Sequence, residues 1–356
     1  MVGPIRVAVL GASGYIGGEA LRLLLGHPEV TVVAVTSPSH AGQPVTRVQP
    51  HLTRLTELCF QADLATAEAA DLDAIFLALP YGAAMAQVPT LLAAGGTGGP
   101  RGDGPVLFDM SGDFRLKDPA AFQQYYGTAQ TAPDWATRAA YGLTEWNRAA
   151  IHTARLVACP GCFPTGALLA LTPLARAGLL AGPVVIDSKT GSSGSGKEPG
   201  EGTHHPSRAA DFRAYGLFTH RHQPEIAQEL GKWQPAGAAP LRVTFTPHSA
   251  PMVRGIFTTA YAFPAQPISP AELQALYVAA YADAWFVRLV DSPRVAVVSH
   301  SNFCDLTATT DGAGTIIITS ALDNLIKGGA GQAVQNLNIA FDRPEQLGLT
   351  FPGTLP

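Results

Sequence analysis

The sequence predicts an α/β fold in which a doubly wound parallel sheet is followed by a second, α+β domain with a mixed or antiparallel sheet. Residues 5–10 (IRVAVL) form an unbroken apolar run, as in a parallel strand buried on both faces, and glycines follow at positions 11, 14, 17 and 18. Short apolar runs then alternate with helical or loop segments up to about residue 110, whereas several runs beyond residue 184 alternate polar and apolar side chains, as antiparallel strands do. The length of 356 residues fits two domains.

The first domain begins with a βαβ unit. After the glycines, apolar side chains recur at helical spacing over residues 20–24, and Gly26 and Pro28 end the helix before a second strand at 30–35. Further segments of this domain are strands at 74–79 and 106–110 and a glycine- and proline-rich surface connection at 95–105.

The second domain is expected to start near residue 160, where a short strand leads into a helix at 165–177. A helical pattern at 324–341 is expected to pack back on the first domain. We therefore expect one domain of residues 1–160 completed by 324–356, and a catalytic and oligomerisation domain of residues 161–323. The strands expected in it are 184–188, 241–245, 255–262, 286–289, 302–309 and 315–320.

Composition excludes several classes of protein. The chain carries 23 basic and 27 acidic residues, and its basic residues are spread along the sequence, so neither nucleic acid nor a membrane surface is an expected partner. Its apolar stretches are broken well before the roughly 20 residues that span a bilayer, and the first residues lack a secretion signal, so we expect a cytoplasmic protein. The 4 cysteines are expected to be reduced thiols.

The first glycines predict a dinucleotide site. Gly11, Ser13, Gly14, Tyr15 and Ile16 open a helix directly after a buried strand, where backbone N–H groups and the helix dipole can hold a pyrophosphate. The alternative is a tight turn between strand and helix that binds no ligand.

The end of the second strand indicates which dinucleotide is bound. An NAD site places an acidic residue there to bind the ribose 2′-hydroxyl, but this chain has Thr36, Ser37 and Ser39 and no acid. NADP(H) is therefore the expected cofactor, with Ser37, Ser39 and Arg47 as candidates for the 2′-phosphate, although a loop arginine is commonly just solvated.

Three interpretations compete for the CxxC motif of Cys159 and Cys162. With His220 and His222 it could bind zinc, or its two thiols could form a redox pair. Alternatively, Cys162 alone is a nucleophile, because a helix start stabilises a thiolate and lowers the pKa of a thiol. We favour the nucleophile, since no second CxxC is present and a thiolate beside a nicotinamide can form a thioester that hydride reduces. No metal ion is then expected.

Histidine is the natural acid/base partner of such a thiol, since its unperturbed pKa of about 6.5 allows proton exchange near neutrality. His220 is the candidate, and the alternative is a solvated surface histidine. Glu225 follows in the same segment and could orient a ring or only cap a helix.

Two segments are suited to bind anions. Residues 188–197 (SKTGSSGSGK) follow a strand and are rich in hydroxyl groups, glycine and lysine, although a flexible linker is the alternative. Residues 109–115 (DMSGDFR) end another strand at the carboxyl edge of the sheet, where Arg115 could bind a carboxylate or acyl phosphate, or pair with Asp113 or Asp118. The candidates are Gly191 for the cofactor, and Ser111, Arg115, Ser188 and Lys189 for the substrate.

Together these motifs resemble those of the N-acetyl-γ-glutamyl-phosphate reductases, the arginine-biosynthesis relatives of aspartate-semialdehyde dehydrogenase. The matching segments run along nearly the whole chain: GASGYIGGEALRLL, ALPYG, DMSGDFRLKD, CPGCFPTGALLAL, DSKTGSSGSGK, HRHQPEI, FTPHSAPMVRGI and SALDNLIKGGAGQAVQNLNI. The resemblance implies a Rossmann-type domain followed by a glyceraldehyde-phosphate-dehydrogenase-like catalytic domain. It also implies reversible, NADPH-dependent reduction of N-acetylglutamyl 5-phosphate to the semialdehyde, through a thioester.

The resemblance also implies site residues. Cys162 would be the nucleophile and His220 the acid/base residue, His222 would bind substrate, and Asn324 would lie near the nicotinamide. It adds Leu79 and Pro80 of ALPYG to the cofactor residues, and it implies a homo-oligomer, a dimer or a tetramer.

One segment departs from this family. Residues 198–219 contain THHP and a nearby arginine, and resemble the reductases that act on carrier-protein-linked 2-aminoadipyl 6-phosphate in lysine biosynthesis. That substrate is the second hypothesis, and a carrier protein would then be a partner. A third hypothesis, from a different class, is a non-catalytic NADP- or zinc-binding regulatory protein that uses the two cysteines of the CxxC motif with His220 and His222.

Overall fold

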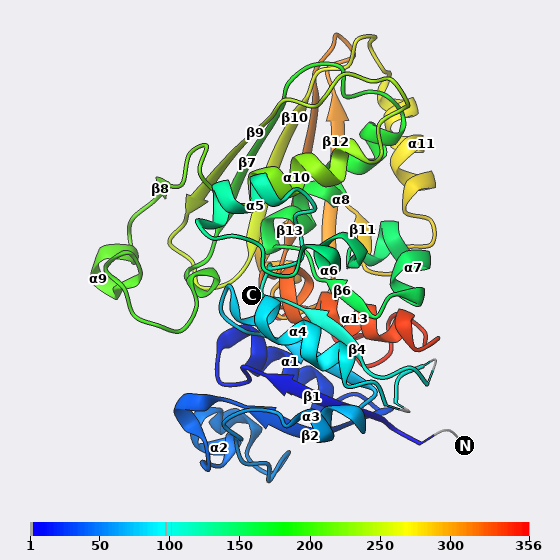
Figure 1. Ribbon diagram of the computed structural model, residues 1–356. Coiled ribbons are helices and arrows are strands. Elements are labelled where there is room, and N and C mark those ends of the chain that lie inside the picture. Colours follow the sequence, from blue (N-terminus) through cyan, green and yellow to red (C-terminus); the bar gives the residue numbers. More distant parts are fainter. Residues whose placement is uncertain (1–2, 97, 101, 356) are drawn as a thin grey trace. The chain divides into compact units, whose positions relative to one another are not determined.

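The computed structural model describes residues 3–96, 98–100 and 102–355 and divides the chain into two compact units (Figure 1). The first unit takes the described residues of Met1–Pro160 and Gly329–Thr350, and the second takes those of Gly161–Gly328 and Phe351–Pro356. Compared with the expected domains, residues 324–328 and the tail from Phe351 group with the second unit.

The first unit contains a six-stranded parallel sheet with the strand order β2-β1-β3-β4-β6-β5. Strands β1, β3 and β4 at its centre are almost wholly buried, which explains their continuous apolar sequences. The strands are β1 (Ile5–Leu10), β2 (Val30–Thr36), β3 (Ala74–Leu77), β4 (Val106–Asp109), β5 (Ala140–Tyr141) and β6 (Leu156–Ala158).

Helices connect these strands, and α13 from the end of the sequence packs on α1 and α7 of the same unit. Nine of the ten residues of α13 are buried, including Gln332, Gln335, Asn336 and Asn338. The helices are α1 (Tyr15–Leu25), α2 (Val45–Val48), α3 (Thr66–Ala70), α4 (Ala83–Ala93), α5 (Pro119–Tyr126), α6 (Pro133–Arg138), α7 (Thr144–Thr153) and α13 (Gly331–Ala340), with 3₁₀ turns at Pro38–His40 and Pro50–Leu52.

The second unit contains a seven-stranded mixed sheet with the strand order β11-β12-β13-β10-β7-β9-β8. Strands β7, β9 and β10 alternate between buried and half-buried residues, as expected when one face of a sheet covers the core. The strands are β7 (Val184–Thr190), β8 (Arg213–Ala214), β9 (Val243–Ser249), β10 (Ile256–Ala262), β11 (Val287–Leu289), β12 (Cys304–Thr310) and β13 (Ile316–Leu322).

Helix α8 (Cys162–Arg176) packs on β10, β13 and α10, and is buried along nearly its whole length. It begins three residues earlier than the expected helix at 165–177, because Pro164 lies in the first turn, where a missing N–H costs no helical hydrogen bond. The other helices are α9 (His205–Arg208), α10 (His222–Gly231), α11 (Pro270–Ala280) and α12 (Val295–Val298), with 3₁₀ turns at Ser192–Ser195 and Glu201–Thr203 and a π-helical turn at Ile326–Ala330.

The parallel sheet followed by the mixed sheet confirms the predicted fold class. Among the described residues, none of the helices combines the length and apolarity that would be required to span a membrane.

Candidate active site

The predicted glycine loop forms a tight turn between β1 and α1 in the first unit. Gly11 has a φ of +80°, and a Cβ atom there would lie 2.3 Å from the carbonyl oxygen of Ala78. Leu79 lies beside the same turn, with its Cδ2 atom 3.6 Å from that Cβ position. Gly14 caps α1, and Tyr15 is exposed at its first position. This close backbone approach is a cradle of the kind that dinucleotide phosphates require.

Hydroxyl groups meet at the ends of β1 and β2. The Ser37 hydroxyl donates to Ser13 Oγ at 2.9 Å, and Ser39 Oγ lies 3.4 Å from Ser37 Oγ. His40 Nδ1 lies 3.0 Å from Ser37 Oγ and 2.9 Å from Ser39 Oγ. Hydroxyl and imidazole donors fit a phosphate, whereas a carboxylate would repel it. Arg47 lies exposed on α2.

Residues 109–115 form a buried turn at the carboxyl end of β4. Burial raises the pKa of the Asp109 carboxyl to about 6, although the Ser111 hydroxyl, which donates to Asp109 Oδ1 at 2.5 Å, opposes that shift. Asp113 accepts the backbone N–H groups of Gly82 and Met85 at the start of α4. The segment therefore fixes the loop after β3 that contains Leu79 and Pro80.

The Arg115 side chain is buried in the same turn. Its Nε donates to the carbonyl oxygen of Cys159 at 2.8 Å, and a terminal nitrogen donates to that of Met110 at 3.4 Å. Asp118, one of its two expected alternative partners, caps α5 by accepting the N–H of Ala120. These contacts orient Arg115 along the carboxyl edge of the parallel sheet.

Cys159 is fully buried in the first unit. Burial raises the pKa of its thiol to about 12, and the nearby Asp109 acts in the same direction. The Asn336 amide donates to Cys159 Sγ at 3.8 Å. A thiol held in its neutral form is a poor zinc ligand and a poor redox partner. Within the described part of the chain, His, Cys, Asp and Glu side chains form no group of three or more that could hold a metal ion.

Cys162 is the first residue of α8 in the second unit and is partly exposed. The N-terminus of a helix stabilises a negative charge, so this position suits a thiolate. Gly161, the preceding residue, donates its N–H to the buried Glu225 carboxylate at 2.8 Å. Glu225 therefore fixes the backbone that leads into the thiol.

Two histidines surround the residue that follows Cys162. The rings of His220 and His222 both pack edge-on against Phe163, with centroid distances of 5.7 and 5.8 Å. His222 lies against Gly161, where a Cβ atom would be 2.5 Å from its Nε2. The structure thus brings three predicted site residues to the start of α8.

Burial lowers the pKa of His220 to about 4, and the positive charge of Arg221 adds to that shift. His220 is therefore neutral at pH 7. Its Nδ1 accepts the backbone N–H of His222 at 3.2 Å, so the neutral ring carries its hydrogen on Nε2.

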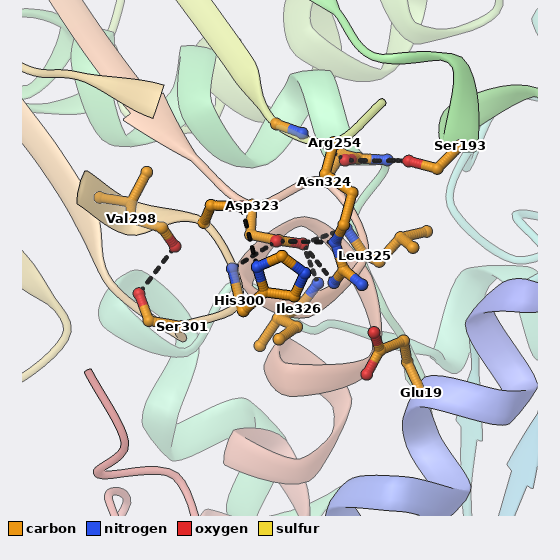
Figure 2. Close-up of polar contacts among 12 residues, drawn as sticks. Glu19, Ser193, Arg254, Val298, His300, Ser301, Asp323, Asn324, Leu325 and Ile326 are labelled. Atoms are coloured by element: carbon orange, nitrogen blue, oxygen red, sulfur yellow. Dashed lines mark hydrogen bonds and ion pairs between the residues drawn. The ribbon is translucent and has the colours of Figure 1, made fainter. Parts of the chain in front are cut away.

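The segment after β7 is held by hydrogen bonds within the second unit. Gly191 donates its N–H to the carbonyl oxygen of Gly255 at 3.0 Å. The amide oxygen of Asn324 accepts the N–H of Gly255 at 2.7 Å, and its nitrogen donates to Ser193 Oγ at 3.0 Å, as Figure 2 shows for Asn324 and Ser193. Asn324 thus fixes the loop that contains Gly191.

Ser188 and Lys189 face opposite sides of the second sheet, because adjacent residues of a strand do so. The buried Ser188 hydroxyl lies 2.8 Å from Thr258 Oγ1, whereas Lys189 Nζ lies 2.5 Å from Asp187 Oδ1 on the half-buried face. The two residues are therefore not brought together at one point.

The structure also adds residues that the sequence did not single out. His40 lies in hydrogen-bond contact with the cluster of serine hydroxyls at the end of β2. The Tyr215 ring packs edge-on against the His220 ring, with a centroid distance of 5.7 Å. Burial raises the pKa of Tyr215, and the nearby Cys162 thiol acts in the same direction. His40 follows the serines at the end of β2 and Tyr215 lies within residues 198–219, but no pattern of residue types at either position indicates these contacts.

Comparison with known proteins gives matches over both units. A family model described as semialdehyde dehydrogenase, NAD binding domain, matches residues 6–154, and one described as semialdehyde dehydrogenase, dimerisation domain, matches residues 162–324. The first unit therefore contains a nicotinamide-dinucleotide-binding domain, and the second a domain of the dimerisation type.

Curated relatives match over almost the full length. An N-acetyl-gamma-glutamyl-phosphate reductase of Methanopyrus kandleri is 44% identical, with 99% of this chain and 100% of the relative covered. A protein of Thermomicrobium roseum named as a LysW-L-2-aminoadipate 6-phosphate reductase is 43% identical, with 99% of each chain covered. The crystal structure of aspartate semialdehyde dehydrogenase II from Vibrio cholerae, complexed with ASA, matches with a TM-score of 0.68 at 16% identity, covering 95% of this chain and 98% of that one, and supports the fold.

Proposed function

The chain belongs to the semialdehyde dehydrogenase family, and we propose that it reduces N-acetyl-L-glutamyl 5-phosphate to N-acetyl-L-glutamate 5-semialdehyde and phosphate in arginine biosynthesis. The position of Cys162 at the first residue of α8, with His220 and His222 packed on the next side chain, is the observation that carries the proposal. The reaction is reversible, and the enzyme is an acyl-phosphate reductase.

In the proposed reaction, the Cys162 thiolate attacks the acyl carbon. The carbon–oxygen bond to phosphate breaks, phosphate leaves, and the acyl group remains on sulfur as a thioester. We propose that the neutral His220 ring donates a hydrogen bond from Nε2 to the acyl oxygen, where negative charge develops. A bound nicotinamide dinucleotide would supply the hydride that converts the thioester to the aldehyde and releases the thiol.

We infer NADP(H) as the cofactor. Ser37, Ser39 and His40 present donors where an NAD site would have a carboxylate, and Gly11 gives the close backbone approach. The dinucleotide would be held by these residues together with Ser13, Gly14, Tyr15, Ile16, Leu79 and Pro80, with Gly191 and Asn324 near its reactive end. NADPH should therefore support turnover with a higher kcat/KM than NADH, and equal values would contradict this cofactor.

We further propose that Ser111, Arg115, Ser188, Lys189 and His222 contribute to substrate binding, and that the protein is a cytoplasmic homo-oligomer, a dimer or a tetramer. The match to a dimerisation domain supports oligomerisation. Light scattering that gives the mass of a single chain would contradict it.

The reverse reaction tests the mechanism. N-acetylglutamate semialdehyde, phosphate and NADP+ should yield NADPH with the wild-type enzyme. Cys162→Ala should abolish this activity, and Cys162→Ser should lower kcat by several orders of magnitude, because a hydroxyl is a far weaker nucleophile at pH 7. Cys59→Ala, which changes an exposed thiol, is the matched control and should remain active. Activity in Cys162→Ala would contradict the mechanism.

A carrier-linked 2-aminoadipyl phosphate is the alternative substrate, suggested by the THHP segment and by the name of the Thermomicrobium roseum relative. Arg208, the arginine nearest to that segment, is buried and donates to the carbonyl oxygens of Thr190 and Ala250. It therefore anchors the segment to the sheet. Turnover with the two acyl phosphates, compared at equal concentration, distinguishes the two functions.

A further inference from the structure

A buried carboxylate lies at the end of β13 in the second unit. Asp323 is fully buried, and its carboxylate accepts from Arg254 Nε at 3.0 Å and from a terminal nitrogen of the same guanidinium at 2.9 Å. It also accepts the backbone N–H groups of His300 at 2.7 Å, Leu325 at 2.9 Å and Ile326 at 3.0 Å. Figure 2 shows the Asp323 carboxylate at the centre of these contacts. A two-point contact with arginine fixes a carboxylate in both position and orientation.

The same residue also holds the far end of the turn that follows it. The backbone carbonyl oxygen of Asp323 accepts the N–H of Gly328 at 2.9 Å, five residues along the chain. This spacing is the hydrogen-bond pattern of a π-helix. Such turns are rare in proteins, and those that occur are often found at functional sites. Residues 323–328, here called the Asp323 turn, are therefore fixed at both ends by one residue.

The Asp323 turn ends against Cys162. A Cβ atom built on Gly328 would lie 3.2 Å from Cys162 Cα and 2.8 Å from Cys162 Cβ, and the second distance is closer than nonbonded carbon atoms approach. The Gly328 backbone therefore limits where the first residue of α8 can lie and how its side chain can rotate. A displacement of the turn would move the thiol.

We infer that Asp323 and Arg254 are positioning residues for Cys162, and that they act through the Asp323 turn and Gly328. This inference rests on the proposed function, in which Cys162 is the nucleophile. The ion pair fixes the carboxylate, the carboxylate and the Asp323 carbonyl fix the turn, and the turn sets the position of the sulfur atom.

Gly328→Ala tests the last step of this chain of contacts. The added methyl group should displace Cys162, and a displacement of about 1 Å should lower kcat about 10²-fold, while KM changes little. The rate at which iodoacetamide alkylates Cys162, followed by mass spectrometry of the peptide that contains it, should fall as well. Gly231→Ala is the matched control, because a Cβ atom at the end of α10 would meet no atom within 4 Å. Wild-type kcat and alkylation rate in Gly328→Ala would overturn the inference.

Arg254→Lys tests the first step, since lysine keeps the charge but cannot form the two-point contact. It should lower kcat and the alkylation rate of Cys162 by about tenfold or more and shift the pH profile of alkylation, with KM nearly unchanged. Arg288→Lys, which alters the Arg288–Asp305 ion pair in the same sheet, is the control and should leave both rates unchanged.

Two outcomes separate this inference from the function on which it rests. If Arg254→Lys lowers only the melting temperature and leaves alkylation and kcat at wild-type values, the ion pair is merely structural and the inference fails. If instead Cys162→Ala remains active, the proposed function fails, whereas the alkylation rates still report whether the Asp323 turn positions the thiol.

Discussion

His220 shows how burial sets the protonation state of a single side chain. Its ring packs among Phe163, Tyr215, His222 and Phe245, and the lost solvation of the imidazolium lowers its pKa to about 4. In the unfolded chain the same ring has a pKa of about 6.5. Between these two values the unfolded state binds more protons than the folded state, so the free energy of unfolding must fall as the pH falls from 6.5 towards 4.

His220→Gln should remove this dependence. In the wild type, the shift should contribute a loss of about 1–2 kcal/mol in the free energy of unfolding between pH 7 and pH 5. Urea unfolding at the two pH values should show a smaller loss for His220→Gln than for the wild type. His51→Gln is the control, because His51 is exposed. Equal losses in all three proteins would contradict the low pKa.

Cys159→Ala should separate the two cysteines of the CxxC motif. Because the Cys159 thiol is buried with a pKa of about 12, it is not ionised at pH 7. The variant should keep kcat/KM within about tenfold of the wild type, a change below 1.4 kcal/mol in transition-state stabilisation. Its free energy of unfolding should fall by about 1 kcal/mol, as for a typical buried substitution.

Steady-state kinetics and metal analysis of the same preparation check this expectation. A complete loss of activity in Cys159→Ala would contradict the nucleophile assignment. About one zinc ion per chain that is lost in the variant would instead revive the zinc-binding interpretation.

At the scale of the element, the turn between β1 and α1 depends on a single glycine. Gly11 and Gly42 have nearly the same φ, +80° and +79°, so alanine strains the backbone equally at both positions. At Gly11 the new Cβ would also lie 2.3 Å from the carbonyl oxygen of Ala78. At Gly42 the new Cβ would have no other atom within 4 Å. The pair therefore separates backbone strain from steric displacement of the cofactor turn.

Gly11→Ala should weaken NADPH binding at least about tenfold, a change of 1.4 kcal/mol or more, whereas Gly42→Ala should leave the dissociation constant nearly unchanged. Backbone strain should cost both variants about 1–2 kcal/mol of stability, and Gly11→Ala should lose more because of its added steric clash. Fluorescence titration with NADPH measures the first effect and urea unfolding the second. Equal dissociation constants in the two variants would show that the turn does not hold the dinucleotide.

Elements that have a strong local pattern could be predicted from the sequence. The apolar run at 5–10 is β1, and the alternating runs in the second half of the chain are strands of the mixed sheet. Short elements without such a pattern, among them β5 and β8 with two residues each, could not be predicted, because tertiary pairing alone defines them.

The candidate site divides in the same way. Cys162 and Gly11 stand in recognisable local motifs. The contact of Gly328 with Cys162 joins residues far apart in the sequence, and the pairing of Asp323 with Arg254 does so as well. A single sequence contains no pattern that brings such residues together, so the positioning contacts could be found only in the structure.

At the scale of the whole molecule, the chain passes between its two units three times, after residues 160, 328 and 350. From the sequence we expected one passage after residue 160 and a return at residue 324, with the rest of the chain in the first domain. Within the second unit, the tail from Phe351 is held by a backbone hydrogen bond from Thr354 to Ser299. A domain boundary drawn once along the sequence therefore does not yield two folded pieces.

The first unit should not fold without α13. The Gln332 amide donates to the buried Thr144 hydroxyl at 2.7 Å, and Thr144 donates to Asn336 Oδ1 at 2.6 Å. Asn336 also donates to the carbonyl oxygen of Gly142, and Asn338 lies 2.9 Å from His27 Nε2. Removal of α13 would leave several buried polar groups unpaired, at about 1–3 kcal/mol each, against a total stability of about 5–15 kcal/mol for a domain.

Two fragments test this expectation. Residues 1–160 alone should melt without a cooperative transition and bind NADPH poorly. The same residues joined to 329–350 by a flexible linker of about 12 residues, which spans roughly 20 Å on average, should melt cooperatively and bind NADPH. In the joined fragment, Asn336→Leu should lower the melting temperature again, because it removes the acceptor of the Thr144 hydroxyl and the donor to the Gly142 carbonyl oxygen. The joined fragment and its Asn336→Leu variant both contain α13, so the difference between their melting temperatures would measure the contribution of the polar contacts. Cooperative melting of residues 1–160 alone would instead show that the first unit folds independently of the end of the chain.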